Sequence, residues 1–195
     1  MSYLVSQFVD RLNTFSAMSS ELSDMIQKVA KVDYYKKGEH LLKESEVCDK
    51  AGLLAKGLVR FYYINEEKDI TSRLMEEGSI ITAWISYYTQ KPSNEFIEAL
   101  EDAVFVYVDY KDTQKLYNDF PEFNKTTRHI IEHAFYLSEQ RTQILRKHTA
   151  EERYRYFIEN HPTLLQRVAL KQIASYLGMN EETLSRVRTK VHRAK

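Results

Sequence analysis

A short basic segment near the end of the chain carries side chains that suit nucleic-acid contacts. Ser185 and Arg186 stand side by side, and Thr189 and Lys190 follow about one helical turn later. A guanidinium group can make two parallel hydrogen bonds to the edge of a guanine, and hydroxyl groups can bond to bases or phosphates. Arg188 and Lys190 suit backbone phosphates. The spacing therefore predicts a helix with one face available to duplex DNA.

The sequence around this segment predicts two short helices that are joined at Gly178. A left-handed glycine would end the first helix, and the Asn180 side chain can cap the second, expected over residues 181–192. Small Ala174 lets the two helices cross closely, as a helix-turn-helix requires. The alternative is a plain helical hairpin that closes a core. The expected apolar anchors are Ile173, Ala174, Leu177, Leu184 and Val187. The expected DNA-binding residues are Lys171, Asn180, Glu182, Thr183, Ser185, Arg186, Arg188, Thr189, Lys190 and Arg193, with Lys195 as a further phosphate contact.

The charge distribution agrees with a polyanion-binding module. The 195 residues contain 28 basic and 28 acidic side chains, so the formal net charge is zero. Residues 141–195 nevertheless hold twelve basic and five acidic side chains, a net +7 that leaves −7 on residues 1–140. A basic terminal quarter on an acidic body favours a nucleic-acid partner, although a basic tail is by itself more often a solvated face.

Two other groups of residues could bind a metal or cofactor, and both are weak signals. His129, Glu132 and His133 fit the H-x-x-E-H pattern of a zinc protease, but no distant third ligand is evident. His40 and Cys48 could serve heme only in the loosest sense. We therefore expect no enzyme activity, no metal site and no resident cofactor.

The elements that would position the basic segment fall into three stretches. Residues 2–30 have helical spacing, with Ser19 or Ser20 as a cap for a second helix. From about residue 32, short runs rich in Val, Ile and Tyr alternate with turn signals, which is typical of an antiparallel sandwich or barrel. The expected strand runs are 32–35, 53–55, 58–64, 70–74, 95–100 and 104–108.

The third stretch is a long helical segment. Helical spacing resumes near Lys111, Pro121 suits a first helical turn, and no proline or glycine interrupts residues 122–160. Along this helix six residues recur at intervals of three and four, which predicts either a dimer seam or a helix that packs on its own domain. The expected dimer seam consists of Thr127, Ile130, Ala134, Leu137, Arg141 and Ile144.

These segments together resemble the Crp/Fnr family of bacterial transcription regulators, which are similar to the cyclic-AMP receptor protein. The most specific match is Ile173–Gly178 followed by Glu182–Arg186; Lys37–Glu44 and Lys56–Arg60 are similar to the family's β-roll, and residues 151–158 to its hinge. The resemblance implies an α+β fold with an N-terminal antiparallel β-roll of jelly-roll type, a long dimerisation helix and a C-terminal helix-turn-helix domain. The implied domains are 1–120, 121–148 and 149–195. The resemblance also favours the dimer seam.

The resemblance places an effector pocket in the roll, where this sequence departs from the family's nucleotide-binding pattern. That pattern has a Gly-Glu pair and an Arg-Ser or Arg-Thr pair, but the matching positions here hold Thr82-Ala83 and Ser93-Asn94. A buried phosphate without a charged partner is costly. We therefore expect no cyclic AMP binding in the usual manner, with any small-molecule effector unidentified. The candidate pocket residues are Arg60, Thr82, Ala83, Trp84, Ser93 and Asn94.

The expected function is that of a homodimeric, sequence-specific transcription regulator that binds a two-half-site operator, with RNA polymerase as a further candidate partner. The alternative is a sensor or adaptor that binds proteins through its roll and helical tail, since Glu181 and Glu182 stand at the head of the second helix. The sequence ends at Lys195, without the β-hairpin wing of many family members. No apolar run of about 20 residues and no signal-peptide pattern is present, so we expect a cytoplasmic protein with no membrane partner.

Overall fold

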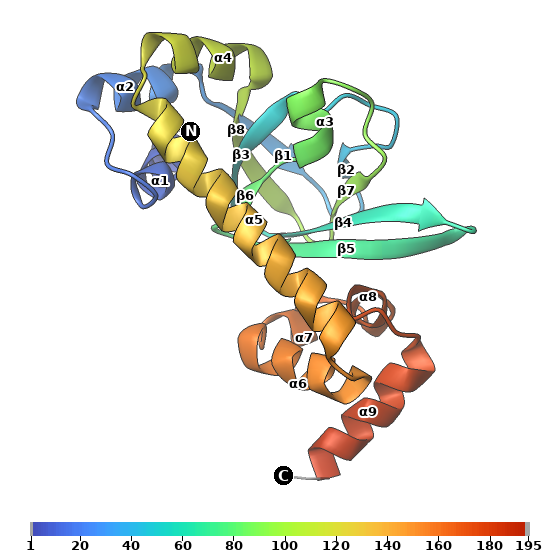
Figure 1. The fold of residues 1–195 in the computed structure, drawn as a ribbon. Helices are drawn as coiled ribbons and strands as arrows, with labels where there is room; N and C mark the ends of the chain where they lie inside the picture. The colour runs from blue at the N-terminus through green and yellow to red at the C-terminus, as the bar shows by residue number, and fades with distance from the viewer. Residues whose placement is uncertain (1, 194–195) are drawn as a thin grey trace. The chain divides into compact units, whose positions relative to one another are not determined.

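The computed structural model describes residues 2–193, with the side chain of His192 left out. It divides into two compact units, the first formed by residues 1–61 and 74–134 and the second by residues 62–73 and 135–195. The element order is that of the expected α+β fold (Figure 1). The helices are α1 Ser2–Asn13, α2 Ser20–Val29, α3 Trp84–Thr89, α4 Tyr110–Asp119, α5 Phe123–Lys147, α6 Ala150–Asn160, α7 Leu164–Arg167, α8 Leu170–Tyr176 and α9 Glu181–Arg193.

The strands form two four-stranded sheets, with the orders β1-β8-β3-β6 and β2-β7-β4-β5. In the first sheet, β1 pairs with β8, and β3 with both β6 and β8, all antiparallel, which agrees with the expected roll. The strands are β1 Lys31–Tyr35, β2 His40–Leu42, β3 Lys50–Lys56, β4 Leu58–Asn65, β5 Lys68–Glu76, β6 Ile80–Ile81, β7 Phe96–Ala99 and β8 Ala103–Asp109.

Strand β8 shows why the first unit has two hydrophobic layers. Phe105 and Tyr107 point into a cluster between the sheets, together with Phe61 and Ile97. The alternate residues of β8 pack against α1, α2 and the first part of α5 on the opposite face of the sheet. Both faces of the strand are thus buried, as its continuous run of apolar residues predicts.

The sequence correctly predicted the two N-terminal helices and six of the strands, but it missed four short elements. Ser19 caps α2, because its hydroxyl accepts a hydrogen bond from the Leu22 amide at 3.2 Å. The elements β2, β6, α3 and α7 were not predicted, because segments of two to six residues are too short for a periodic pattern to show.

The long helical stretch is interrupted after Lys147, although neither proline nor glycine marks the break. Thr149 and Glu152 form a capping box at the start of α6: the Thr149 hydroxyl accepts from the Glu152 amide at 3.3 Å, and Glu152 accepts from the Thr149 amide at 2.7 Å. These bonds satisfy backbone donors that a continuous helix would have used internally. The T-x-x-E pattern was the signal for this break.

We expect the substitution Thr149→Ala to lower the free energy of unfolding by about 1 kcal/mol, because it removes the cap from α6. Urea titration followed by circular dichroism measures this change. Ser6→Ala on α1 is the control, since it removes an exposed helix hydroxyl that is not a cap. Equal stability of the two variants would contradict a stabilising role for the capping box.

Candidate functional site

The two helices predicted around Gly178 are present as α8 and α9. Gly178 has a φ of +64°, and a Cβ atom at this position would lie 3.0 Å from Arg153 Nη1, so both conformation and space favour glycine. Asn180 Oδ1 accepts a hydrogen bond from the Thr183 amide at 2.8 Å, which confirms the expected cap of α9. These local signals fix the turn between the helices at residues 177–180.

The inner face of α9 holds the helix in the second unit. Leu184 and Val191 are both 1% exposed, and they belong to the buried set that includes Tyr154, Phe157 and Ile173. Helix α9 contacts both α6 and α8. This packing makes α9 a rigid support for the side chains on its outer face.

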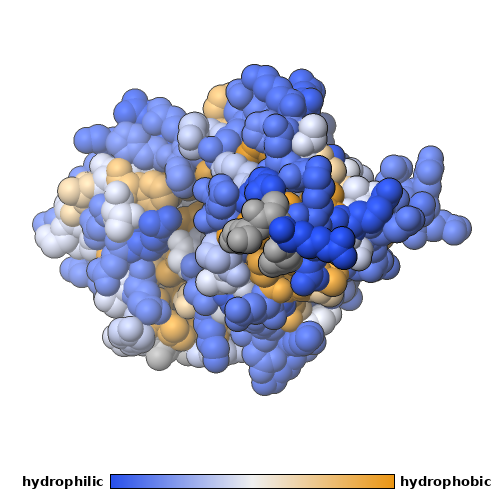
Figure 2. Space-filling model, turned by 90° about the horizontal axis from the view of Figure 1, so that it is seen from below, coloured by the Kyte–Doolittle hydropathy of each residue, from blue (hydrophilic) through white to orange (hydrophobic). Residues whose placement is uncertain are grey.

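The outer face of α9 carries five of the predicted DNA-binding side chains around one shallow groove. They are Ser185, Arg186, Thr189, Lys190 and Arg193. All five side chains are exposed, as are those of Lys171, Asn180 and Glu182, whereas Thr183 and Arg188 are half-buried. The surface seen in Figure 2 is mainly hydrophilic, with smaller apolar patches between the polar side chains. Lys195 lies outside the described residues.

Ion pairs within the second unit use two of the predicted phosphate-binding lysines. Lys190 pairs with Glu151 at 2.6 Å, and Lys171 lies 3.9 Å from Asp69. The hydrogen bond from Lys190, followed by that from Arg155, lowers the pKa of the Glu151 carboxyl. Exposed pairs of this kind contribute at most about 1 kcal/mol, so a phosphate can compete for either lysine.

The first part of strand β5 contacts α8, a contact that the sequence did not predict. The Thr71 amide donates to Ser175 Oγ at 2.9 Å, and Ser175 Oγ lies 3.4 Å from the Asp69 carbonyl oxygen. Thr71 and Ser175 are 104 positions apart in the chain. No local pattern signals such a pairing, so only the tertiary structure reveals it.

Arg141, which the sequence assigned to the dimer seam, contacts α8 instead. Its Nη2 donates to the Tyr176 carbonyl oxygen at 2.7 Å, and its guanidinium carbon lies 3.8 Å from the centre of the Tyr176 ring. Burial lowers the pKa of this guanidinium, and the positive charge of Arg73 acts in the same direction. The Arg141 side chain is therefore bonded within its own chain.

The other predicted seam residues are divided between inner and outer positions of α5. Ile130 is 8% exposed and packs in the first unit, and Thr127 donates to the Phe123 carbonyl oxygen at 3.0 Å. Ala134 and Ile144 are half-buried, whereas Leu137 is 43% exposed. The most exposed apolar side chains of α5 also include three that the sequence did not select: Ile131, Phe135 and Tyr136.

The predicted effector-pocket residues do not form one open site. Arg60 is 7% exposed and its Nε lies 2.5 Å from Glu98 Oε2, so the guanidinium is engaged within the roll. The Thr82 hydroxyl donates to the Lys50 carbonyl oxygen at 2.9 Å. Ala83 and Ser93 are buried, and Asn94 is exposed. Trp84 alone among the six lines the apolar cavity of the first unit.

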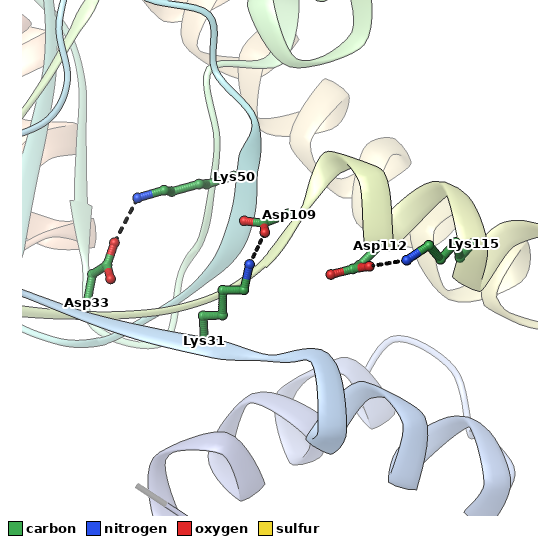
Figure 3. Close-up of polar contacts among 6 residues, drawn as sticks. All are labelled: Lys31, Asp33, Lys50, Asp109, Asp112 and Lys115. Atoms are coloured by element: carbon green, nitrogen blue, oxygen red, sulfur yellow. Dashed lines mark hydrogen bonds and ion pairs between the residues drawn. The ribbon is translucent and has the colours of Figure 1, made fainter.

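Charged side chains on the first sheet and on α4 neutralise one another (Figure 3). Lys50 of β3 points toward Asp33 of β1, with 2.7 Å between Nζ and Oδ2; Lys31 pairs with Asp109, and Lys115 with Asp112. Burial raises the pKa of Asp33, but the hydrogen bond and charge of Lys50 and the hydrogen bonds from Tyr35 and Tyr107 together outweigh burial, so the pKa lies below its usual range. Burial raises the pKa of neighbouring Tyr35 to about 12.

The residues considered for metal chemistry are dispersed. His129 Nδ1 lies 2.8 Å from the Phe15 carbonyl oxygen, and the His133 ring contacts the Phe15 ring. No three His, Cys, Asp or Glu side chains in the described part of the chain are arranged to hold a metal ion. None of the helices within residues 2–193 has the length and hydropathy of a membrane span.

The chain is similar to known proteins in part of its sequence and in its fold. Residues 32–120 match the family model of the cyclic nucleotide-binding domain. No curated protein matches the chain. Similar solved structures include FixK2 from Bradyrhizobium japonicum, with a TM-score of 0.71, 20% identity and coverage of 85% of this chain and 86% of that one. A mutant of CooA from Carboxydothermus hydrogenoformans has a TM-score of 0.68 and 21% identity, with coverage of 90% and 80%.

A third similar structure is CLP from Xanthomonas campestris, which is described as a c-di-GMP responsive global regulator. Its TM-score is 0.70 at 11% identity, and the match covers 90% of this chain and 93% of that one. The similarity confirms the fold that the resemblance in the sequence implied. Residues 32–120 therefore match the cyclic nucleotide-binding domain model, and the chain as a whole has the fold of these solved structures.

Proposed function

We propose that this protein is a sequence-specific DNA-binding transcription regulator that acts as a homodimer on a two-half-site operator. The observation that carries the proposal is the division of α9 into two faces. Leu184 and Val191 are buried in the second unit, while the opposite face presents the groove lined by Ser185, Arg186 and Lys190. A helix whose inner face is buried in the protein and whose exposed face is polar and basic is suited to bind in the major groove of DNA.

The individual side chains on this face suit different parts of a DNA duplex. Arg186 is exposed, and its Nη2 lies 3.3 Å from Thr183 Oγ1, a bond weak enough to exchange for a guanine edge. Lys190 and Arg193 suit phosphates and would make the affinity depend on salt. Glu182 can accept a hydrogen bond from a cytosine amino group. Both acids at the start of α9 also interact favourably with the helix dipole.

A row of side chains along α5 supports a homodimer. Ile131, Phe135, Ser138, Thr142 and Leu145 recur at intervals of four, three, four and three, which is a heptad seam displaced by one position from the one that the sequence suggested. The first three of these side chains are exposed, and Thr142 and Leu145 are half-buried. Ile131 is 39% exposed and Phe135 is 66% exposed in the single chain. Pairing of two such helices about a twofold axis would cover these side chains and present two α9 helices to two half-sites.

We also propose that cyclic AMP does not control this protein in the usual manner. The hydroxyl groups of Thr82 and Ser93 are hydrogen-bonded within the roll, and the Arg60 guanidinium lies against Glu98. A cyclic phosphate would have to break the Arg60–Glu98 pair and leave a carboxylate behind in a half-buried place, which is costly. Cytoplasmic action and contact with RNA polymerase belong to the same proposal.

The test of DNA binding is a selection from a randomised duplex pool with the purified full chain and no added ligand. We expect enrichment of a palindrome with two half-sites about one helical turn apart. The logarithm of the affinity should fall linearly with the logarithm of the salt concentration. Absence of enrichment even at low salt, with capture of a protein from cell extract instead, would favour an adaptor.

We expect Arg186→Ala to weaken binding about 5- to 150-fold at each half-site, because a bidentate base contact contributes about 1–3 kcal/mol, and by about the square of that factor on the two-half-site operator. The substitution should also relax the preference at one base position of each half-site. Fluorescence anisotropy with a set of single-base operator variants measures both effects. Arg146→Ala on α5 is the matched control for loss of one exposed positive charge. A uniform loss across all operator variants would assign Arg186 to a phosphate rather than a base.

A further inference from the structure

The first unit contains a small apolar cavity outside the β-roll interior. Its volume is about 60 Å³, and α1, α2, β3, α3, α4 and the first half of α5 contribute to its walls. Phe8, Trp84, Tyr88, Tyr117 and Ile130 are among the lining residues. No charged side chain lines it among the described residues. The cavity is distinct from the predicted effector pocket, with which it shares only Trp84.

One lining residue, Tyr87, has an unsatisfied polar group. Its side chain is 2% exposed, and its hydroxyl has no hydrogen-bond partner of acceptable geometry. Burial raises the pKa of this phenol, while the nearby Thr113 hydroxyl has a smaller effect in the opposite direction. The phenol therefore stays protonated at neutral pH and keeps a proton to donate. A buried donor without a partner costs about 1–3 kcal/mol, which a ligand acceptor would recover.

The walls around Tyr87 are held in place by aromatic contacts. The Tyr87 ring meets the Tyr88 ring edge-on at 5.6 Å between centroids and the Tyr110 ring at 5.3 Å. Trp84 stacks on Tyr88 at 6.0 Å. Such contacts fix ring orientations, so the cavity cannot readily collapse around the hydroxyl. Tyr88 is 46% exposed and Ile131 is 39% exposed, which gives the cavity an edge on the surface.

We propose that this cavity binds a small uncharged molecule that is mainly apolar and carries one oxygen, which accepts a hydrogen bond from Tyr87. The size follows from the volume: a 150 Å³ apolar cavity holds a benzene molecule, so 60 Å³ holds about two or three non-hydrogen atoms. The remaining atoms of a four-atom molecule such as 1-propanol or acetone would extend past Tyr88 toward the surface. Short alcohols and ketones have this form. The absence of charged lining groups excludes carboxylates, amines and phosphates as occupants.

The test uses two probes on the full chain, xenon for the apolar volume and 1-propanol for the volume together with the oxygen. Methyl NMR of Ile26, Ile130 and Ile131, which line the cavity, reports occupancy. In the unmodified protein both probes should give saturable shifts at these methyl groups. Tyr87→Phe should keep xenon binding within about twofold and weaken 1-propanol binding about fivefold, the value of one neutral hydrogen bond.

A second variant separates the cavity from the hydroxyl. Thr127→Leu enlarges a lining side chain while Tyr87 is retained, so both probes should bind at least about tenfold more weakly. Saturable shifts for neither probe in the unmodified protein would overturn the proposal. Equal 1-propanol affinity in the unmodified protein and in Tyr87→Phe would also overturn it, because the hydroxyl would then be satisfied by water or by Thr113.

Discussion

The substitution Phe135→Glu is expected to convert the proposed dimer to a monomer. The Phe135 side chain is 66% exposed in the single chain and lies in the proposed seam of α5. Burying a phenylalanine contributes about 1.5–3 kcal/mol, and a twofold axis makes each loss count twice. The expected effect is therefore at least about 3 kcal/mol, a dissociation constant raised about 100-fold or more, before the repulsion between two carboxylates is included.

Tyr136→Glu provides a matched control for this experiment. Tyr136 is 60% exposed and is the next residue on the same helix, about 100° around the axis from Phe135 and away from the seam. Sedimentation equilibrium should show a monomer for Phe135→Glu and a dimer for Tyr136→Glu, with unchanged unfolding of the monomer in both. A stable Phe135→Glu dimer would place the subunit interface elsewhere.

Loss of the dimer has a direct consequence for DNA binding. A two-half-site operator is bound tightly because the second α9 helix is already positioned when the first has bound. The Phe135→Glu variant should therefore lose the preference for two correctly spaced half-sites, although its α9 surface stays unchanged. Binding to duplexes with one and two half-sites, measured at the same salt concentration, distinguishes this result from loss of the DNA-binding surface.

The second large effect is expected from Arg141→Leu, which should destabilise the second unit by about 2–3 kcal/mol. The substitution removes the 2.7 Å hydrogen bond to the Tyr176 carbonyl oxygen and the stacking on the Tyr176 ring. A hydrogen bond from a charged group contributes about 1.5–3 kcal/mol and the cation–π contact about 1 kcal/mol. Relief from burying the guanidinium, the group whose pKa burial lowers, offsets part of this sum.

Hydrogen exchange of the α8 amides is the measurement suited to Arg141→Leu, since it reports local opening of the helix that the guanidinium contacts. Exchange in α8 should accelerate, and DNA affinity should fall in parallel because α8 supports α9. Arg146→Leu, an exposed arginine on the same helix, should leave the exchange unchanged. Equal exchange in both variants would mean that the bond to Tyr176 adds no net stability.

Helix α5 shows which features residue periodicity can predict and which it cannot. Residues spaced three and four apart correctly predicted the helix. Two heptad registers are compatible with this helix, however, and the sequence favoured the one that contains Ile130 and Arg141. The structure uses both of these side chains within the chain, and it exposes Phe135 in the neighbouring register. Helical spacing defines stripes, but which stripe is covered depends on the elements that pack against it.

At the turn between α8 and α9, the sequence alone determined the local structure. Asn180 caps the helix and Gly178 adopts the left-handed conformation, because both effects involve atoms only a few residues apart in the chain. The alternation of buried Leu184 with exposed Ser185 and Arg186 follows from the helix period for the same reason. The fold of the roll was predicted from short apolar runs and turn signals, and from family resemblance.

The tertiary structure alone decided the contacts between distant segments. Ser175 bonds to the β4–β5 hairpin, Arg60 lies against Glu98, and Tyr87 stands with an unpaired hydroxyl at an apolar cavity, none of which any local pattern signals. Such contacts join residues separated by many positions, and their energies depend on burial and geometry that are set only when the sheets and helices have packed. Local hydrogen bonds and helix periods depend on residues that are close in the sequence, whereas the partner of a buried polar group depends on the whole fold.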